Sequence, residues 1–599
     1  MSVLSITDLK VSFQTNDGVV EAVKGVDFHI KPGECLGIVG ESGSGKSQSF
    51  MAAMGLLPPN GSVTGSVKLQ GQEILNLPLS KLNKIRGDDV GMIFQDPLTA
   101  LTPHLTVGDQ MGEVLKVHKD MAGSKARAHC LDWLNRVRIP EAARRMKQYP
   151  HELSGGMRQR VMIAMAMLCD PKLLIADEPT TALDVTVQAE ILDLMSALQQ
   201  EQGTAIALIT HDMGVVARMC DRIEVMRKGE FVEYGDVKEI FANPKHIYTR
   251  KLLDSMPRID SKNAPTGTAL EAPKLLEVDD LRVNFDIKNK GLFSKPTPLR
   301  AVNGVSFSLA EGETLGIVGE SGCGKSTLAR SVLQLIPPSS GAVTWLGAPL
   351  NKLAKRELTK RRKDLQIVFQ DPLASLDPRM TISASIQEPL KTFRPDLTSG
   401  ERRKTVEQMM ERVGLDLNMI NRYPHELSGG QNQRVGIARA MINNPRLVIC
   451  DEAVSALDVS IQAQILTLLK DLQAEFGMSM MFISHDLSVV RTISNRIMVL
   501  YLGRIVELGD GETICSSPQH PYTQALISAV PIPDPVIERQ RTRINIPGEL
   551  PSPLDPKAGL RFLPSRLNAG DVDYVPKLNE VSPNHFVAEH DPLEVILAG

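Results

Sequence analysis

One ordered set of motifs occurs twice in this chain. Residues 40–47, Gly-Glu-Ser-Gly-Ser-Gly-Lys-Ser, return as residues 319–326, Gly-Glu-Ser-Gly-Cys-Gly-Lys-Ser. Each copy is followed by a Gln-Asp-Pro, a Leu-Ser-Gly-Gly, an apolar run ending in Asp-Glu, and a Ser/Thr-His-Asp. The offset between equivalent residues is nearly constant, from 279 at Lys46 and Lys325 to 274 at Glu178 and Glu452. Such a constant offset predicts a duplicated domain.

The length and composition fit two soluble domains. A chain of 599 residues is too long for one core, and 42% hydrophobic with 23% charged residues is typical of globular proteins. The net charge of −3 disfavours a free nucleic-acid binder. The start lacks the pattern of a signal peptide, and no apolar run approaches the roughly 20 residues that cross a bilayer. We therefore expect a cytosolic protein that does not itself span a membrane.

The chain divides into four predicted segments. Residues 1–256 hold the first copy, and 257–274 have no hydrophobic period and are typical of a flexible linker. Residues 275–530 hold the second copy. Residues 531–599 are rich in proline and polar residues and form an extension without a counterpart in the first half. Seven single cysteines, none in a Cys-x-x-Cys pair, favour reduced thiols over disulfides or a zinc site.

Short apolar runs end where the motifs begin. Residues 36–39, 173–176 and 206–209 are apolar throughout or nearly so, which predicts strands buried on both faces of a mainly parallel sheet. Ligands of such sheets bind at the carboxyl ends of the strands, where these motifs fall. Helices are expected over 160–168 and 188–200. The fold class is therefore α/β, with two tandem nucleotide-binding domains.

The glycine-rich loops fit a nucleotide phosphate. Gly40, Gly43 and Gly45 allow backbone amides to turn inward as a nest for phosphate oxygens, and the following helix adds its positive end. Lys46 would neutralise the outer phosphates, and Ser47 would offer a hydroxyl to Mg²⁺. A turn without a ligand is the alternative for one loop, but two copies in matching context disfavour it.

The Asp-Glu pairs and the histidines fit phosphoryl transfer. Asp177 and Asp451 could hold Mg²⁺, while Glu178 and Glu452 could orient the attacking water or accept its proton. Alone, such a pair is more often a solvated strand end, but a preceding glycine-rich loop reverses that interpretation. His211 and His485 each follow a predicted buried strand, and their expected role is a hydrogen bond to the γ-phosphate. The alternative is a histidine without such a role, which is either on the surface or already hydrogen-bonded.

The Leu-Ser-Gly-Gly motifs permit two interpretations. Ser154 and Ser428 could simply cap a helix, with two glycines easing the turn. The same geometry, exposed amides at a helix N-terminus, is also an anion site. Because each domain already carries one phosphate cradle, a second cradle suggests a γ-phosphate gripped from across an interface.

This combination resembles the ABC ATPase family over residues 1–530. The further family motifs are a Gln loop, at Gln95 and Gln370, and an Ala-Leu-Asp loop, at 182–184 and 456–458. The resemblance implies a helical signature subdomain and a head-to-tail pairing of the two domains around two ATP. One site would join Lys46, Ser47, Gln95, Asp177, Glu178 and His211 to Ser428, Gly430 and Gln431; the other would join Lys325, Ser326, Gln370, Asp451, Glu452 and His485 to Ser154, Gly156 and Met157.

The resemblance also implies a wider nucleotide-binding set. Phe13 and Phe285 occupy matching places and could stack on adenine, although a core or edge-strand aromatic is the alternative. The implied Mg²⁺ residues are Ser47, Gln95, Asp177, Ser326, Gln370 and Asp451. The remaining expected binding residues are Gly40, Ser42, Gly43, Ser44, Gly45, Gln48, Gly155 and Gly429, with Gly319, Ser321, Gly322, Cys323, Gly324 and Thr327.

Both sites are expected to be competent. The copies differ at Gln48 and Thr327, at Met157 and Gln431, and at Pro179 and Ala453. None of these differences removes a charge that phosphoryl transfer needs. Two working sites are therefore predicted, whether or not their activities are equal.

The sequences around the motifs resemble one branch of the family. Residues 176–189 and 454–464 look like the first and second ATPases of dipeptide, oligopeptide and nickel importers. Residues 520–523, His-Pro-Tyr-Thr, echoed by 246–249, His-Ile-Tyr-Thr, resemble that branch's C-terminal signature, and fused pairs of this kind resemble the ATPases of glutathione and of oligopeptide or microcin C importers. Many members follow the signature with cysteines that hold an iron–sulfur cluster. Residues 559–566 contain none, so no cluster is expected.

The implied function is that of the ATP-hydrolysing subunit of a bacterial importer for a peptide-like solute. The implied partners are two transmembrane permease subunits and an extracytoplasmic solute-binding protein, with this chain peripheral on the cytoplasmic face of the inner membrane. A groove around the Gln loops, at 96–103 and 371–378, would receive permease helices. The 531–599 extension could brace or regulate the domain pair, or be a surface strap. The solute, whether peptide, glutathione, opine, sugar or nickel, is not specified by this sequence.

Two other classes compete with this interpretation. A soluble double-cassette ABC ATPase could act on the ribosome or on nucleic acid, but such proteins carry a long basic linker, and this one is short and nearly neutral. Fused sugar-importer ATPases are a nearer rival, although their second cassette is usually degenerate. Neither the iron–sulfur cluster nor a nucleic-acid partner is expected.

Overall fold

The computed structural model describes residues 2–16, 18–181, 183–261, 272–287, 296–455, 457–547, 551–555 and 557–598. It divides into two units. The first contains Met1–Met256, Asp458–Ser460 and Pro531–Arg541, and the second contains Pro257–Leu457, Ile461–Val530 and Thr542–Gly599. Ala182, Ala456 and residues 262–271 of the predicted linker lie outside the described residues.

The first unit contains an antiparallel sheet and a mainly parallel sheet. In the second of these, five neighbouring strands run parallel and only the outermost, β10, is antiparallel. The antiparallel sheet has the order β2 (Gly18–Ile30), β1 (Leu4–Thr15), β4 (Gly61–Leu69), β5 (Gln72–Glu73); the mainly parallel sheet has the order β10 (Glu230–Asp236), β9 (Arg222–Arg227), β3 (Cys35–Val39), β8 (Ala205–Thr210), β7 (Leu173–Asp177), β6 (Val90–Ile93).

The second unit repeats this plan and extends it. Two strands from the C-terminal extension, β22 and β21, continue the sheet beyond β20. The antiparallel sheet has the order β12 (Thr297–Ala310), β11 (Lys274–Ile287), β14 (Ser340–Trp345), β15 (Ala348–Pro349); the larger sheet has the order β16 (Leu365–Val368), β17 (Leu447–Asp451), β18 (Ser479–Ile483), β13 (Thr314–Val318), β19 (Arg496–Tyr501), β20 (Arg504–Asp510), β22 (His585–Ala588), β21 (Leu578–Ser582).

The central strands are buried at every residue. This holds for β3, β7 and β8 in the first unit and for β13, β17 and β18 in the second. Burial on both faces explains why their sequences are continuous apolar runs rather than alternating ones. The predicted strands at 36–39, 173–176 and 206–209 are confirmed.

One helix in each unit packs between the two sheets. It is α1 (Lys46–Ala53) in the first unit and α12 (Lys325–Val332) in the second, where α12 contacts β11, β12 and β17. Phe50 of α1 and Leu328 of α12 are fully buried among residues of both sheets. Each helix follows its glycine-rich loop directly, so core packing fixes the direction in which the loop opens.

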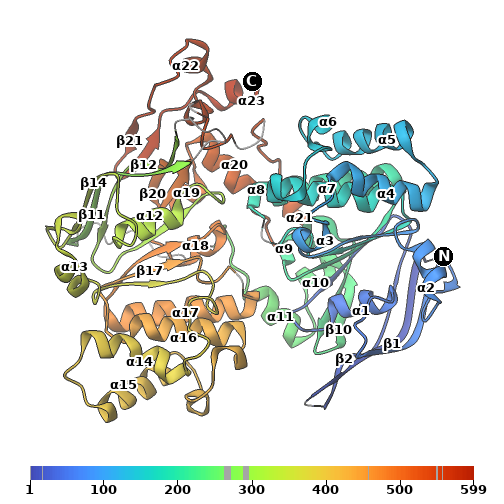
Figure 1. Cartoon of the computed structure of the whole chain (residues 1–599), viewed down its shortest axis with the longest axis horizontal. Helices are drawn as coiled ribbons and strands as arrows, with labels where there is room; N and C mark the ends of the chain where they lie inside the picture. The colour runs from blue at the N-terminus through green and yellow to red at the C-terminus, as the bar shows by residue number, and fades with distance from the viewer. Residues whose placement is uncertain are drawn as a thin grey trace. The chain divides into compact units, whose positions relative to one another are not determined.

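A helical segment lies between β6 and β7, and its counterpart between β16 and β17. In the second unit α14 and α15 lie against α16 (Figure 1). The first segment contains α3 (Pro97–Ala100), α4 (Val107–Lys119), α5 (Gly123–Arg136), α6 (Ala142–Arg145), η1 (Pro150–Glu152) and α7 (Gly155–Met167), after α2 (Leu79–Ile85) before β6; the second contains α14 (Ile382–Phe393), α15 (Ser399–Arg412), η4 (Leu417–Met419), η5 (Pro424–Glu426) and α16 (Gly429–Met441), after η3 (Leu350–Lys352) and α13 (Lys355–Arg361) before β16. The predicted α/β fold with a helical subdomain is confirmed.

Further helices follow the Asp-Glu and Ser/Thr-His-Asp motifs. They include the predicted helix at 188–200, which is confirmed. In the first unit these are α8 (Val185–Gln202), α9 (Met213–Met219), α10 (Val237–Ala242) and α11 (Ile247–Asp254); in the second, α17 (Val459–Phe476), α18 (Leu487–Ile493), α19 (Gly511–Ser516) and α20 (Pro521–Ala529); the extension holds α21 (Pro535–Glu538), η6 (Ala558–Leu560), α22 (Pro564–Asn568) and α23 (Leu593–Ala598).

Two global properties bear on function. Among the described residues, no helix combines the length and the apolar character that a membrane crossing needs. None of the seven cysteines, all of which lie in the described ranges, forms a disulfide, and six of them are buried. Burial raises the pKa of Cys450, next to Asp451, to about 12, so this thiol remains protonated and acts as an apolar filler.

Candidate active sites

Each glycine-rich loop closes around its own lysine. Lys46 Nζ donates to the carbonyls of Gly40 at 2.7 Å and Glu41 at 2.9 Å, and Lys325 Nζ donates to those of Gly319 at 2.7 Å and Glu320 at 3.0 Å. Burial lowers the pKa of Lys46. Carbonyl oxygens accept these hydrogen bonds without neutralising the ammonium charge, which fits a site that receives phosphate.

Glycine is required where the loop meets the helix. Gly45 has φ 107° and Gly324 has φ 106°, both in the left-handed region. A Cβ on Gly45 would lie 2.4 Å from Ala22 O, and one on Gly324 would lie 2.1 Å from Ala301 O. Both conformation and space therefore exclude any side chain there. The amide-lined start of α1 and α12 is left free of side chains.

The other predicted loop residues lie around this cradle. Apart from the adjacent residues of the chain, no atom of the described residues lies within 4 Å of a Cβ built at Gly43 or Gly322, so the loop is open at that point. Ser44 and Cys323 are buried at equivalent positions, as small side chains under the loop. Ser42 and Ser321 are not buried, and Gln48 and Thr327 lie half-buried in the first turns of α1 and α12.

A serine and an aspartate meet at the helix side of each loop. Ser47 Oγ donates to Asp177 Oδ1 at 2.8 Å, and Ser326 Oγ donates to Asp451 Oδ1 at 2.8 Å. Burial raises the pKa of both aspartates. Hydroxyl and carboxylate oxygens fit Mg²⁺, which takes few protein ligands and completes its shell with substrate phosphates and water. Accordingly, the described residues contain no cluster of three or more His, Cys, Asp or Glu placed for a metal.

The glutamate after each aspartate is the centre of a hydrogen-bonded group. Glu178 accepts from Gln95 Nε2 at 2.9 Å and from Thr181 Oγ1 at 2.9 Å, and its Oε1 lies 3.2 Å from His211 Nδ1. Glu452 accepts from Gln370 Nε2 at 2.7 Å and lies 3.7 Å from His485 Nδ1. The structure thus brings together the predicted Gln, Glu and His of each copy.

The protonation states of this group follow from its contacts. Burial alone would raise the pKa of Glu178, but the hydrogen bond and charge of His211, with Thr181 and Lys46, lower it to about 2. The nearby His485 lowers the pKa of Glu452. In turn, the glutamates raise the pKa values of His211 and His485. Each glutamate is therefore an ionised acceptor at neutral pH, suited to orienting a water molecule.

Both glutamates have an unusual backbone conformation that the sequence motifs do not predict. Glu178 has φ 47° and Glu452 has φ 51°, in the left-handed region that residues with a side chain rarely adopt. Their amides donate to Ile209 O and Ile483 O, at the ends of β8 and β18. The hydrogen bond to the neighbouring strand thus holds a strained turn in place, and strained backbone of this kind is common at functional sites. The nearest sequence signal is the Thr181 hydroxyl, three residues on.

The Leu-Ser-Gly-Gly motifs do begin helices. Ser154 Oγ accepts from Met157 N at 3.2 Å to start α7, and Ser428 Oγ accepts from Gln431 N at 3.3 Å to start α16. Gln431 completes a capping box by accepting from Ser428 N at 2.9 Å, which Met157 cannot do. The capping interpretation therefore holds, and it leaves the exposed helix N-termini available for an anion.

The second glycine of each motif also has a packing role. A Cβ on Gly156 would lie 2.7 Å from Val187 of α8, and one on Gly430 would lie 2.7 Å from Ile461 of α17. At Gly155 and Gly429 the nearest side-chain atom lies 3.9 Å away. Only the second glycine is needed for the close approach of the neighbouring helix.

The two predicted adenine-stacking residues differ. Phe13 of β1 packs against the core of the first unit, whereas Phe285 of β11 is 40% exposed. They occupy equivalent strands of the antiparallel sheets, opposite Val20 and Leu299. An exposed aromatic is free to stack on a base, while Phe13 has only part of a face available.

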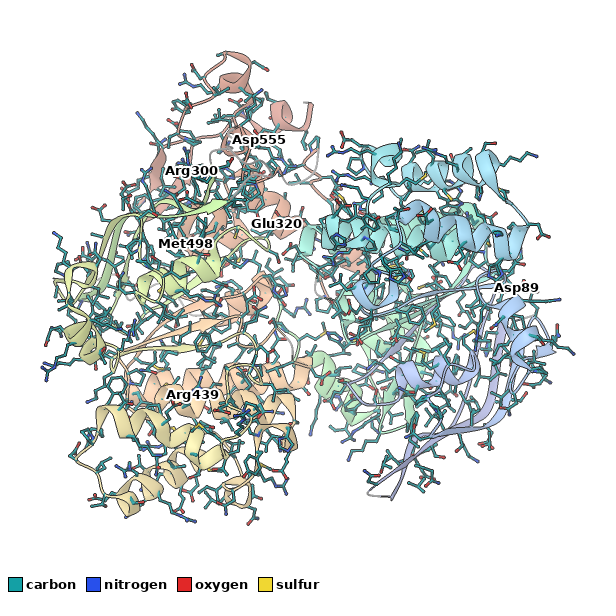
Figure 2. All side chains as sticks on the ribbon, in the orientation of Figure 1. Asp89, Arg300, Glu320, Arg439, Met498 and Asp555 are labelled. Carbon is teal, nitrogen blue, oxygen red and sulfur yellow. The ribbon has the colours of Figure 1, made fainter. Side chains whose placement is uncertain are left out.

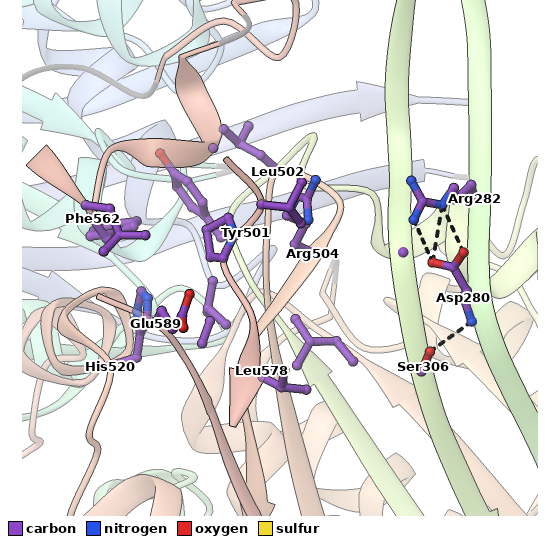
Figure 3. A pocket seen from close by; sticks show the side chains of 18 residues that line it. Asp280, Arg282, Ser306, Tyr501, Leu502, Arg504, His520, Phe562, Leu578 and Glu589 are labelled. Carbon is purple, nitrogen blue, oxygen red and sulfur yellow. Dashed lines mark hydrogen bonds and ion pairs between the residues drawn. The ribbon is translucent and has the colours of Figure 1, made fainter. Parts of the chain in front are cut away.

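A separate pocket of about 240 Å³ lies in the second unit, and none of the predicted site residues line it. Figure 3 shows Asp280, Arg282 and Ser306 on one side of it and His520, Phe562 and Glu589 on the other. Arg282 and Asp280 are paired to each other at 2.8 Å. The pocket is formed where the C-terminal extension covers β19 and β20.

Two family models match this chain. A family model described as "ABC transporter" matches residues 23–181 and 302–455, and one described as "Oligopeptide/dipeptide transporter, C-terminal region" matches 232–279 and 506–571. The match at 232–279 shows that part of the C-terminal region has a counterpart in the first half. This counterpart is longer than the similarity between residues 246–249 and 520–523 indicates.

Relatives align over nearly the full length. The glutathione import ATP-binding protein GsiA of Pectobacterium atrosepticum is 45% identical, with 98% of this chain and 97% of the relative covered. The protein of the same name from Escherichia coli K12 is 43% identical over the same shares. Among solved structures, a dimeric ATP-binding cassette, MJ0796 bound to ADP and Pi, matches 39% of this chain and 98% of its own, with 32% identity and a TM-score of 0.36. The chain belongs to the ABC transporter family, as an ATP-hydrolysing protein with two ATP-binding cassettes.

Proposed function

We propose that this chain drives the uptake of a small peptide, of the glutathione class, through separate permease subunits. The observation that carries the proposal is the full-length similarity to glutathione import ATP-binding proteins, at 43–45% identity over 98% of the chain. The match of two segments to the oligopeptide/dipeptide transporter C-terminal region supports a peptide-like solute.

The hydrolytic step is proposed to use the same residues in both copies. Lys46 and Lys325 would bind the outer phosphates. Ser47 with Asp177, and Ser326 with Asp451, would hold Mg²⁺, which would supply neutralisation of the phosphate charge. Glu178 and Glu452 orient the attacking water and accept its proton. The ionised state and repeated contacts of these glutamates support this assignment.

The two ATP molecules are proposed to lie between the cassettes in a head-to-tail pair. Ser428, Gly430 and Gln431 would cap the ATP held by Lys46, and Ser154, Gly156 and Met157 would cap the ATP held by Lys325. The signature serines support this because each begins a 13-residue helix whose first two residues are glycines. A disulfide between engineered cysteines at Ser42 and Ser428, formed faster with MgATP, is expected; equal rates without nucleotide would contradict the pairing.

Permease docking is proposed at the Gln loops. Asp96 caps the short turn that contains Leu98, and Asp371 caps the one that contains Leu373. Leu98 is 54% exposed and Leu373 is 50% exposed. Equivalent, rigidly presented leucines in both copies suit a hydrophobic permease helix at the cytoplasmic face of the membrane. The external partner would be a solute-binding protein.

Uptake in a deletion strain tests the proposal. Wild-type protein should restore uptake of labelled glutathione or a dipeptide, and the double variant Glu178→Gln, Glu452→Gln should not. The purified chain should also carry two multi-span proteins with it from detergent extracts. Restored uptake of nickel or a sugar in place of peptides would reject the solute class, and a chain that copurifies with ribosomes instead would reject the transport role.

A further inference from the structure

A tyrosine lies behind the glycine-rich loop in both copies. The amide of Glu41 donates to Tyr248 Oη at 3.2 Å, and the amide of Glu320 donates to Tyr522 Oη at 3.2 Å. Glu320 is labelled in Figure 2. The two partners are 207 and 202 residues apart in the sequence. Because the contact occurs within each unit separately, it is a repeated feature of the cassette.

The tyrosine and the phosphate-binding lysine hold the same peptide group. The peptide between Gly40 and Glu41 presents its N–H to Tyr248 and its carbonyl to Lys46 Nζ, at 2.7 Å. In the second copy, Tyr522 and Lys325 hold the peptide between Gly319 and Glu320 in the same way. A peptide fixed at both ends cannot rotate without breaking both hydrogen bonds, so the tyrosine sets the position of the oxygen on which the lysine rests.

Each tyrosine is itself held rigidly. His246 Nδ1 accepts from the Tyr248 amide at 3.2 Å, and His520 Nδ1 accepts from the Tyr522 amide at 3.1 Å. These hydrogen bonds cap the helices α11 and α20. A buried glutamate on the preceding strand, Glu233 or Glu507, accepts from the two amides before the tyrosine's helix, including that of the histidine.

The buried surroundings keep these groups neutral. Tyr248 and Tyr522 are both buried, and burial raises the pKa of each hydroxyl. The hydroxyl therefore stays protonated and available to the loop. Burial lowers the pKa of His520 to about 3, so its ring stays neutral and Nδ1 remains an acceptor. Tyr522 Oη also lies 3.2 Å from Glu320 Oε2, to which it can donate.

We propose that Tyr248 and Tyr522, from the His-x-Tyr-Thr turns, are positioning residues for ATP binding, acting through the peptide on which the phosphate-binding lysine rests. This inference rests on the proposed role of Lys46 and Lys325. It gives the oligopeptide/dipeptide transporter C-terminal region a direct part in the nucleotide site. The tyrosines act through the peptide that they hold, so their effect is on how well the loop is formed before ATP arrives.

The test is removal of the hydroxyl alone, in the full-length protein. In Tyr248→Phe, Tyr522→Phe and the double variant, a buried amide loses its acceptor while the ring stays packed. Because the loop is misplaced equally for bound ATP and for the transition state, KM for ATP should rise about fivefold or more in the double variant, with kcat within twofold of wild type. Each single variant should show a smaller rise.

Controls separate this role from simple stabilisation. Tyr234→Phe removes an exposed hydroxyl from β10, and Tyr501→Phe removes a buried one whose ring lies 4.8 Å from that of Tyr522. Among the described residues no hydrogen bond joins either hydroxyl to Glu41 or Glu320, so neither substitution should change KM. A lower melting temperature with unchanged KM in the double variant, or an equal KM rise in the controls, would overturn the proposal. Lys46→Ala and Lys325→Ala should each weaken binding of MgATP; if they do not, the proposed ATP sites fail, whatever the tyrosine variants show.

Discussion

Gln95 donates a hydrogen bond to Glu178, and the same pair occurs in the second copy as Gln370 and Glu452, at 2.9 and 2.7 Å. The residue expected to reach Mg²⁺ is thus tied to the residue expected to orient water. Since Gln95 and Gln370 precede the exposed turns of Leu98 and Leu373, a contact made at those turns has a short path to the glutamate.

Loss of either catalytic glutamate should slow ATP hydrolysis. Glu178→Gln and Glu452→Gln each remove the charge that orients water, and loss of about 3 kcal/mol of transition-state stabilisation corresponds to at least a hundredfold at that site. The measurement is steady-state turnover of each single variant and of the double variant. If one single variant keeps the wild-type rate, the prediction of two competent sites is wrong.

Removal of a docking leucine should uncouple hydrolysis from uptake. Leu98→Ala with Leu373→Ala leaves the hydrogen bonds of Gln95 and Gln370 in place, so basal ATP hydrolysis of the isolated chain should stay within twofold. Uptake in the deletion strain should fall at least tenfold, because the proposed apolar contact with the permease would be lost. Leu79→Ala, at an even more exposed leucine on α2, is the control and should support normal uptake.

The serine that pairs with each buried aspartate should set the Mg²⁺ requirement. Ser47→Ala and Ser326→Ala remove one oxygen ligand and leave the aspartate without its donor, so the Mg²⁺ concentration for half-maximal hydrolysis should rise about tenfold. Ser49→Ala serves as control, because its hydroxyl donates to Gly45 O within α1 rather than toward Asp177. An unchanged Mg²⁺ titration in Ser47→Ala would argue against this ligand.

The second glycine of each signature should be less tolerant than the first. Gly430→Ala places a Cβ 2.7 Å from Ile461, and overpacking of this kind costs about 1–3 kcal/mol. Gly429→Ala meets only an ordinary 3.9 Å contact and should leave the free energy of unfolding nearly unchanged. Denaturant unfolding of both variants checks this. If both variants lose the same free energy of unfolding, the limited space beside α16 is not the reason for glycine at position 430.

The histidine and glutamate pairs should make stability depend on pH. Contact with the glutamates raises the pKa values of His211 and His485, so their contribution is complete below the unfolded value of about 6.5 and is lost as pH rises through the folded value. For Glu178 the contribution is present above about 4.3 and is lost as pH falls toward about 2. His211→Gln with His485→Gln should therefore lower the melting temperature more at pH 5.5 than at pH 9.

An exposed histidine provides the comparison for that experiment. His104→Gln should change the melting temperature equally little at both pH values. A double variant whose loss is the same at pH 5.5 and pH 9 would contradict the paired state of the two histidines in the nucleotide-free protein.

Motifs and apolar runs predict the parts of this molecule that local sequence controls. The strands before Gly40 and Asp177 and the helix after Asp184 follow from burial and capping, which act over a few residues. The hydrogen bond from Glu41 to Tyr248 spans 207 residues and depends on how β10 and α11 return to the loop, which no local pattern encodes. The left-handed backbone of Glu178 is imposed by its bond to Ile209, on another strand. The sheet strands β21 and β22 were not expected, because the exposed β21 has no apolar alternation.

The unequal edges of the two sheets have a consequence for the duplication. In the first unit the described sheet stops at β10, whereas in the second β22 pairs with β20, and His585 of β22 lies 2.8 Å from Glu507, the residue that anchors the turn before Tyr522. The two halves share the residues around the glycine-rich loop and differ at the edge of the larger sheet. The extension therefore supports the turn before Tyr522 in the second unit, while in the described part of the first unit no further strand pairs with β10 at the corresponding edge.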